Sequence, residues 1–152
     1  MNFYAYSGLF NSVLLLVAEG VLIFNWKKNR SIRYFNLFNL SALFWAISYF
    51  FWQTSKNYDQ ALFWVKMLMV GATLAAPTFL HFTAVLTNKT KRLLAPIIIF
   101  YFLALISIFV NFTSSQYIVN LQTKLGIPFF PTAGIYYFYH GFIPESNATL
   151  GA

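Results

Sequence analysis

Residues 60–87 read QALFWVKMLMVGATLAAPTFLHFTAVLT, and Lys66 is the one charged residue in this run. A helix needs about 20 mainly apolar residues to cross a hydrocarbon core about 30 Å thick. Polar segments bound the run on both sides, at residues 54–59 and 88–92. The stretch therefore predicts a transmembrane helix and assigns the chain to the integral membrane proteins.

Three more apolar runs of spanning length lie at roughly residues 6–26, 34–53 and 93–111. Hydrophobic residues make up 59% of the 152-residue chain and charged residues 9%, whereas a soluble domain carries about 25% charged residues. We expect an all-α, integral membrane helical bundle with four transmembrane helices at 6–26, 34–53, 60–87 and 93–111. Residues 1–152 then form a single membrane domain with an outer tail at 112–152.

The basic residues alternate between the connecting loops. Loops 27–33 and 88–92 hold seven of the ten Lys and Arg residues, whereas loop 54–59 holds Lys56 beside Asp59. The positive-inside rule places the two basic loops in the cytoplasm. We therefore expect a multi-pass cell-membrane protein whose N-terminus and outer tail lie outside. This distribution accounts for the net charge of +7, so no nucleic-acid partner is expected.

The outer tail contains an aromatic stretch at residues 132–144. Pro128 and Pro131 prevent a regular helix just before it, and Thr132 could serve as the N-cap of a helix that ends before Pro144. Such a helix is too short to span a bilayer. Two alternatives remain open: the stretch lies along the outer interface, or it is a partial fifth helix.

Three polar side chains lie inside the expected spans at a similar depth. Glu19, Asn39 and His81 are each about 9–10 Å from the cytoplasmic face at 1.5 Å per residue. Ionisable residues within a membrane helix mark functional sites. The three could form one intramembrane polar layer that responds to pH or binds a polar ligand. Alternatively, they form interhelical hydrogen bonds that fix the packing.

Pro77 lies inside the third expected helix, after several small residues: Gly71, Ala72, Ala75 and Ala76. Small residues let membrane helices approach closely, and proline leaves a backbone carbonyl without its helical partner. The pattern predicts either a hinge at Pro77 or tight packing around a static bend.

The chain lacks the motifs of common enzymes. It has no cysteine, no phosphate-binding glycine loop, no His-Glu-x-x-His and no Gly-x-Ser-x-Gly. We expect no cofactor and no metal. Three function classes remain open: the input module of a membrane receptor, a small multi-pass transporter component or accessory membrane subunit, and a membrane enzyme using Glu19 and His81. The last has two acid–base groups but no nucleophile.

Five positions in the third expected helix follow a recognisable order: a tryptophan and a basic residue near the start, then a proline followed by aromatics. These are Trp64, Lys66, Pro77, Phe79 and Phe82. The order resembles the N-terminal seven-helix membrane region of sensor histidine kinases, which also precedes PAS and diguanylate cyclase modules. A glycine and tyrosines in the tail resemble the start of that region's fifth helix: Gly134, Tyr136, Tyr137 and Tyr139.

The resemblance implies a sensor module that acts in signal transduction within a two-component system. Its helices would transmit a stimulus to a cytoplasmic signalling domain in cis, and helix–helix contacts would form a homo-oligomer in the lipid bilayer. The sequence contains neither helices five to seven nor any kinase motif. We therefore expect an input module truncated after the fourth helix, without its catalytic output domain and without enzyme activity of its own. The ligand is unknown.

Overall fold

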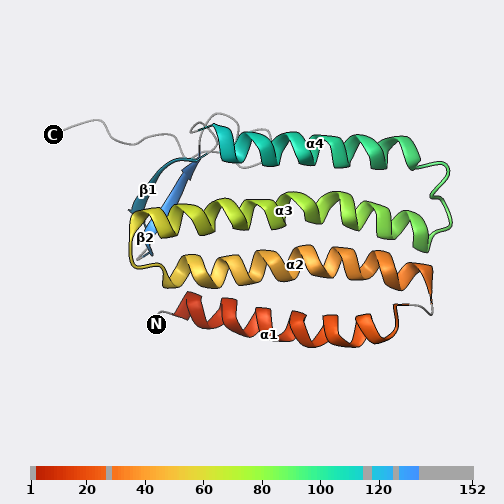
Figure 1. Ribbon diagram of the computed structural model, residues 1–152, viewed down its shortest axis with the longest axis horizontal. Helices are drawn as coiled ribbons and strands as arrows, with labels where there is room; N and C mark the ends of the chain where they lie inside the picture. The colour runs from red at the N-terminus through yellow and green to blue at the C-terminus, as the bar shows by residue number, and fades with distance from the viewer. Residues whose placement is uncertain (1–2, 27–28, 115–117, 125–126, 134–152) are drawn as a thin grey trace.

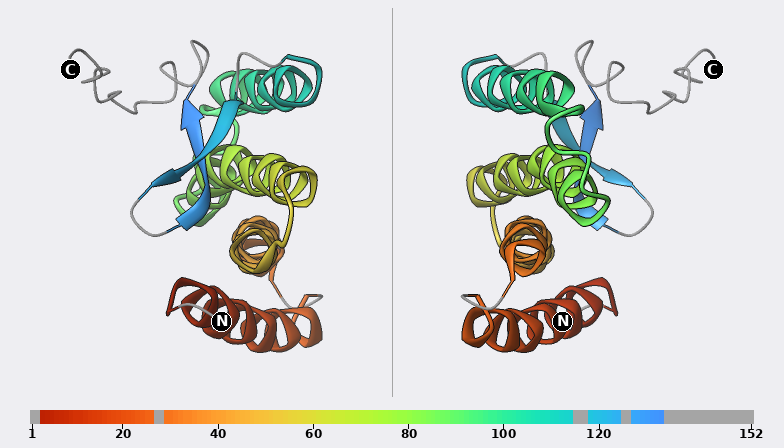
Figure 2. Two further views of the ribbon diagram at one scale, coloured as in Figure 1. Left: turned by 90° about the vertical axis from the view of Figure 1, so that its left-hand side faces the viewer. Right: turned by 90° about the vertical axis from the view of Figure 1, so that its right-hand side faces the viewer.

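The computed structural model describes residues 3–26, 29–114, 118–124 and 127–133 (Figure 1). Four helices lie side by side in chain order, each antiparallel to the one before (Figures 1 and 2). They are α1 (Phe3–Phe24), α2 (Arg30–Thr54), α3 (Tyr58–Leu86) and α4 (Leu94–Thr113). All four are long and apolar enough to cross a membrane. The predicted all-α membrane bundle is confirmed, and each helix end lies within four residues of its expected place.

Short polar connectors fix where the helices begin and end. The Asn29 side chain accepts a hydrogen bond from the Ser31 amide at 3.0 Å and so caps α2. Asn57 caps α3 in the same way, accepting from the Gln60 amide at 2.9 Å. After the last residue of α3, Leu86, the chain turns away at Asn88. The φ of Asn88 is 56°, in the left-handed region that asparagine tolerates. The loops are therefore specified by local side-chain chemistry.

The two central helices pack on both sides, whereas α1 and α4 each have a helix on one side only (Figure 2). Large apolar side chains remain exposed on these outer helices, such as Phe10 on α1 and Phe109 on α4. In water such surfaces would drive association, but a bilayer solvates them. The outer faces of α1 and α4 are therefore surfaces suited to contact with lipid or with other membrane helices.

Aromatic pairs define the register of α2 against α3. Phe35 lies 5.1 Å from Phe82, and Phe38 lies 5.3 Å from Phe79, measured between ring centroids. Partner positions rise along one helix and fall along the other, as an antiparallel pair requires. Such ring contacts add about 0.5–1.5 kcal/mol each beyond their buried area.

Gly71 allows α2 and α3 to approach closely at the middle of this seam. A Cβ atom at Gly71 would lie 2.7 Å from the backbone nitrogen of Trp45 and 2.9 Å from its Cα. Backbone atoms of a packed helix cannot move aside as a flexible side chain does. The expectation of close packing around the small residues of α3 is thus met at Gly71.

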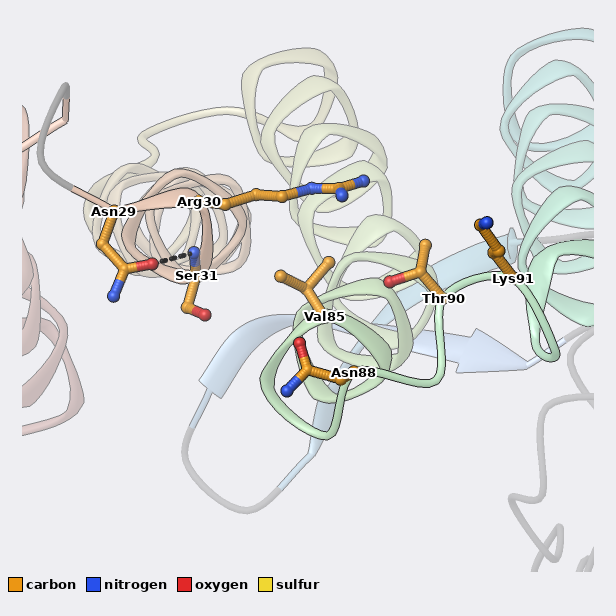
Figure 3. Close-up of a pocket in the computed structure, with 7 residues that line it drawn as sticks. All are labelled: Asn29, Arg30, Ser31, Val85, Asn88, Thr90 and Lys91. Atoms are coloured by element: carbon orange, nitrogen blue, oxygen red, sulfur yellow. Dashed lines mark hydrogen bonds between the residues drawn. The ribbon is translucent and has the colours of Figure 1, made fainter.

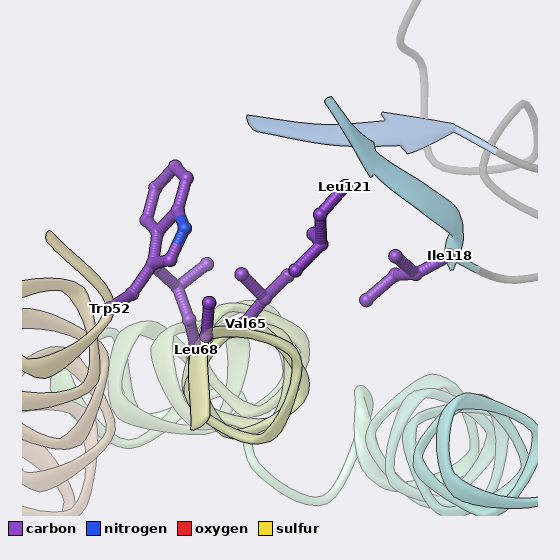
Figure 4. Close-up of a cluster of buried hydrophobic side chains, with 6 residues drawn as sticks. Trp52, Val65, Leu68, Ile118 and Leu121 are labelled. Carbon is purple, nitrogen blue, oxygen red and sulfur yellow. The ribbon is translucent and has the colours of Figure 1, made fainter. Parts of the chain in front are cut away.

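A β-hairpin follows α4 and was not anticipated from the sequence. Strands β1 (Ile118–Lys124) and β2 (Ile127–Ala133) pair antiparallel and lie beside α3 (Figure 2). Ile118 and Leu121 of β1 join a buried cluster with Val65 and Leu68 of α3 (Figure 4). The hairpin is therefore part of the packed structure at the end of the bundle where α2 ends and α3 begins (Figure 1).

The hairpin corrects one detail of the sequence analysis. Thr132 is not a helix N-cap, because it lies in β2 opposite Asn120 and donates from its hydroxyl to the Asn120 carbonyl at 2.8 Å. Strand β1 provides the hydrogen-bonding partner that keeps the backbone of β2 extended here. The rest of the aromatic stretch lies outside the described residues, including Gly134, Tyr136, Tyr137 and Tyr139.

Replacing Gly71 with alanine should destabilise the helix pair by about 1–3 kcal/mol, because the new methyl group overlaps the Trp45 backbone. Gly20→Ala is the matched control, since nothing lies within 4 Å of a Cβ there. That control should be neutral or slightly stabilising because alanine favours helix. Thermal unfolding of the purified chain in detergent measures both. Equal melting temperatures for the two variants would contradict close contact at Gly71.

Candidate functional site

A carboxylate and an amide meet between α1 and α2. Asn39 donates from Nδ2 to Oε2 of Glu19 at 2.7 Å and also approaches the Leu15 carbonyl at 3.3 Å. Both side chains are 5% exposed. A charged or polar group held inside a bilayer without water needs such a partner. The pair is therefore a fixed polar contact between the first two helices.

A second polar contact lies on the opposite face of α2. Ser41 Oγ and Thr78 Oγ1 of α3 are 3.2 Å apart, and either can donate. Each hydroxyl also lies 2.7 Å from a carbonyl of its own helix, Ser41 from that of Phe38 and Thr78 from that of Leu74. A hydroxyl has one proton, so the one that donates across the helices gives up the bond to its own helix. Either Ser41 or Thr78 can be that donor.

Asn36 adds an amide one helical turn from Asn39. Its side chain is 1% exposed, and neither its oxygen nor its nitrogen has a hydrogen-bond partner among the described residues. Oε1 of Glu19 is likewise buried and unpartnered within the described part of the chain. An unsatisfied buried polar group costs about 1–3 kcal/mol. Asn36 and Oε1 of Glu19 are thus buried polar groups without a partner among the described residues.

His81 does not join this group. Its ring stacks on Tyr34 with centroids 4.1 Å apart and meets the edge of Tyr101 at 6.0 Å. No hydrogen bond between described residues joins His81 to Glu19 or Asn39. The expected single layer is therefore two sites: Glu19 with Asn39 between α1 and α2, and His81 in an aromatic contact with α2 and α4.

Helical geometry explains the separation. Asn39 follows Tyr34 by five residues, which turns an α-helix by about 140° beyond a full turn. Asn39 therefore faces α1, whereas Tyr34 meets His81 of α3. Similar depth in the membrane placed these residues in one layer, but the direction of each side chain decides which of them meet.

The motif positions of α3 lie at its contacts with neighbouring helices. Trp64 stacks on Phe51 of α2 with centroids 4.5 Å apart, and the Lys66 carbonyl accepts a hydrogen bond from Asn111 of α4 at 2.9 Å. Pro77 is fully buried beside Thr78. Phe79 and Phe82 form the aromatic pairs with α2 described above. Four of the five motif side chains thus lie at or beside helix–helix contacts of α3, and Lys66 takes part through its backbone carbonyl.

Comparison with known proteins agrees with this arrangement. Residues 9–144 match the family model described as the N-terminal 7TM region of histidine kinase. The chain belongs to this family. Comparison with curated proteins and with solved structures gives no match. The resemblance inferred from Trp64, Lys66, Pro77, Phe79 and Phe82 is confirmed at the level of the family.

Membership of the histidine kinase membrane region identifies the chain as a membrane sensor module of histidine kinase type, an input region and not a catalytic one. The bilayer is its environment, and the family implies a signalling domain on the cytoplasmic side. Among the described residues, no three His, Asp or Glu side chains gather into a group that could hold a metal ion. The site is therefore a set of interhelical contacts.

Several site residues were missed in the sequence. Asn36 carried a usable signal, since an amide three residues from Asn39 falls on nearly the same helix face. Ser41 and Thr78 carried none, because hydroxyl residues commonly bond to their own helix backbone. Trp52, which donates from Nε1 to the Phe129 carbonyl at 2.8 Å, could not be paired without knowing the hairpin.

A double-mutant cycle measures the Glu19–Asn39 contact. Glu19→Leu and Asn39→Leu should show a coupling of about 0.6–1.7 kcal/mol, the range of hydrogen bonds between membrane helices. Glu19→Leu with Ser41→Ala is the control pair, and it should be additive within about 0.5 kcal/mol because Ser41 faces α3. Unfolding by denaturing detergent gives both values. Additivity in both cycles would rule out the contact as a stabilising one.

Proposed function

We propose that the chain is the membrane-embedded input module of a histidine-kinase-type receptor, and that its catalytic output domain lies outside these 152 residues, in cis. One observation carries the mechanism: α2 is hydrogen-bonded on two faces inside the membrane, to Glu19 of α1 and to Thr78 of α3. A rotation or translation of α2 must change both contacts. The three helices can therefore respond as one unit.

The position of α2 supports this role. Near its C-terminal end, Trp52 is bonded to the hairpin through the Phe129 carbonyl. Its N-terminal end at Arg30 lies in a basic loop. We propose that a stimulus at the hairpin displaces α2, and that the displacement reaches the basic end of the bundle. Rigid secondary-structure elements can carry coupling between distant sites.

We propose Pro77 as the hinge of α3. Proline lacks the amide proton that would bond to the carbonyl one turn earlier, so the helix is weakest there. Thr78, the next residue, holds the contact with Ser41. Bending at Pro77 would thus move the side of α3 that touches α2. The Glu19–Asn39 pair and His81 are the polar groups whose surroundings such a movement alters.

We further propose that loops 27–33 and 88–92 face the cytoplasm of a cell membrane, and that the modules associate as homo-oligomers through their exposed outer helices. The charge distribution supports the orientation. Lys27 and Lys28 contribute to it by sequence and lie outside the described residues.

The size of the native protein tests the assignment in cis. An antibody against residues 113–125, used on native membranes, should detect a band several times larger than 17.5 kDa. The reason is that a kinase domain on the same chain adds mass. A band at 17.5 kDa would show that any output domain is on a separate chain.

Single-cysteine labelling tests the orientation, because the native chain has no cysteine. In intact cells, a membrane-impermeant maleimide should label Lys56→Cys but should label Lys89→Cys only after permeabilisation. Both lysines are exposed in short connectors at opposite ends of the bundle, so they form a matched pair. The reverse pattern of labelling would invert the proposed topology.

A further inference from the structure

A cavity of about 290 Å³ lies at the basic end of the bundle, between the start of α2 and the connection from α3 to α4. Arg30 and Ser31 line one side, and Thr90 and Lys91 line the other (Figure 3). Arg30 extends from α2 across the cavity toward the connection (Figure 3). Two cationic side chains from different loops therefore border one small space.

Among the described residues, no carboxylate balances the positive charge of this cavity. The chain has three acidic residues. Glu19 is buried and bonded to Asn39, and Asp59 is in the first turn of α3, at the opposite end of the bundle. Glu145 lies outside the described residues. An anion from outside the described fold can therefore supply the missing charge.

The Arg30 side chain and the backbone just before Lys91 have contacts of their own within the fold. The end of α3 forms a Schellman motif, in which the Lys89 amide donates to the Ala84 carbonyl at 2.8 Å and the Asn88 amide donates to the Val85 carbonyl at 3.1 Å. This turn fixes the backbone that carries Lys91. The Arg30 guanidinium lies 5.8 Å from the centroid of the Tyr34 ring, within cation–π range. Groups ordered in advance lose less entropy on binding.

The donors around the cavity suit a phosphate. Arginine forms paired, charge-assisted hydrogen bonds to phosphate oxygens, and lysine adds a second charge. The Ser31 amide, the second of α2, is already taken, because it donates to Oδ1 of Asn29. Recognition therefore depends on the side chains of Arg30 and Lys91, with hydroxyl groups of Ser31 and Thr90 beside them. A cavity of this volume is near the lower limit for ligand pockets, which fits a headgroup.

We propose that this cavity binds the phosphate group of an anionic membrane lipid. Arg30 is the first residue of α2, and Lys91 lies three residues before α4 begins, so both are at the level where headgroups lie. A bound phosphate would bridge the start of α2 and the α3–α4 connection, two segments that α3 separates in the chain. Assignment to the inner leaflet rests on the orientation proposed above, whereas binding itself does not.

The test uses the purified chain in nanodiscs of phosphatidylcholine mixed with phosphatidylglycerol, followed by native mass spectrometry of the retained lipid. The wild type should retain phosphatidylglycerol preferentially. Arg30→Gln combined with Lys91→Gln should bind it about 30-fold more weakly, as expected for two basic residues at an anionic surface. Lys56→Gln combined with Lys89→Gln removes the same charge from two residues that do not line the cavity, and it should weaken binding clearly less. Equal weakening in the two double variants would show general attraction to the anionic surface and would overturn the cavity as the site.

Two further measurements keep the result decisive. Arg30→Lys retains the charge and should retain most of the binding, and circular dichroism checks that each variant is folded. Equal retention of phosphatidylglycerol by the wild type and the folded Arg30→Gln, Lys91→Gln variant would overturn the proposal. If inorganic phosphate at constant ionic strength instead raises the melting temperature of the wild type without competition from phosphatidylglycerol, the bound phosphate does not belong to a lipid. No outcome depends on signalling, so failure here is distinguishable from failure of the proposed function.

Discussion

The hydrogen bonds that α2 makes on both of its faces are the constraint on which the rest of the bundle depends. Inside a bilayer, no water is available to solvate the amide of Asn39 or the hydroxyl of Ser41. The Asn39 amide finds its partner on α1, and the Ser41 hydroxyl meets Thr78 of α3 besides a carbonyl of its own helix. The positions of those partners fix the rotation of α2 about its axis. The aromatic pairs with α3 and the close approach at Gly71 are then geometrically possible.

The sequence was sufficient for the class and for the four helices, because long apolar runs have few alternatives in a membrane. It was also sufficient for close packing at Gly71 and for the family motif of α3. It was insufficient for His81, because depth along a helix does not determine the facing direction. It was insufficient for the hairpin, because β1 packs against Val65 and Leu68, which lie fifty or more residues earlier. Contacts of that sequence separation are not encoded in any local pattern.

The two ends of the bundle differ in chemistry. At one end the hairpin covers α3 with apolar side chains and is bonded to Trp52 of α2. At the other end, the start of α2 borders a cationic cavity shared with the α3–α4 connection. Helix α3 reaches both ends, because its Val85 also lines the cavity, and so does α2, which is bonded to α1 and α3 in between. A force on either end therefore acts on the same helix, and through Asn39 and Ser41 on its neighbours.

The polar groups of α2 exceed what stability alone requires. The aromatic seam and the small residues of α3 already provide dispersion and shape complementarity between α2 and α3. Replacing Asn36, whose amide has no partner among the described residues, with an apolar side chain of similar size would remove a penalty of about 1–3 kcal/mol. The Asn36 amide and Oε1 of Glu19 are thus buried polar groups that the described part of the bundle leaves without a partner. Their cost is borne by the aromatic and close-packed contacts between α2 and α3.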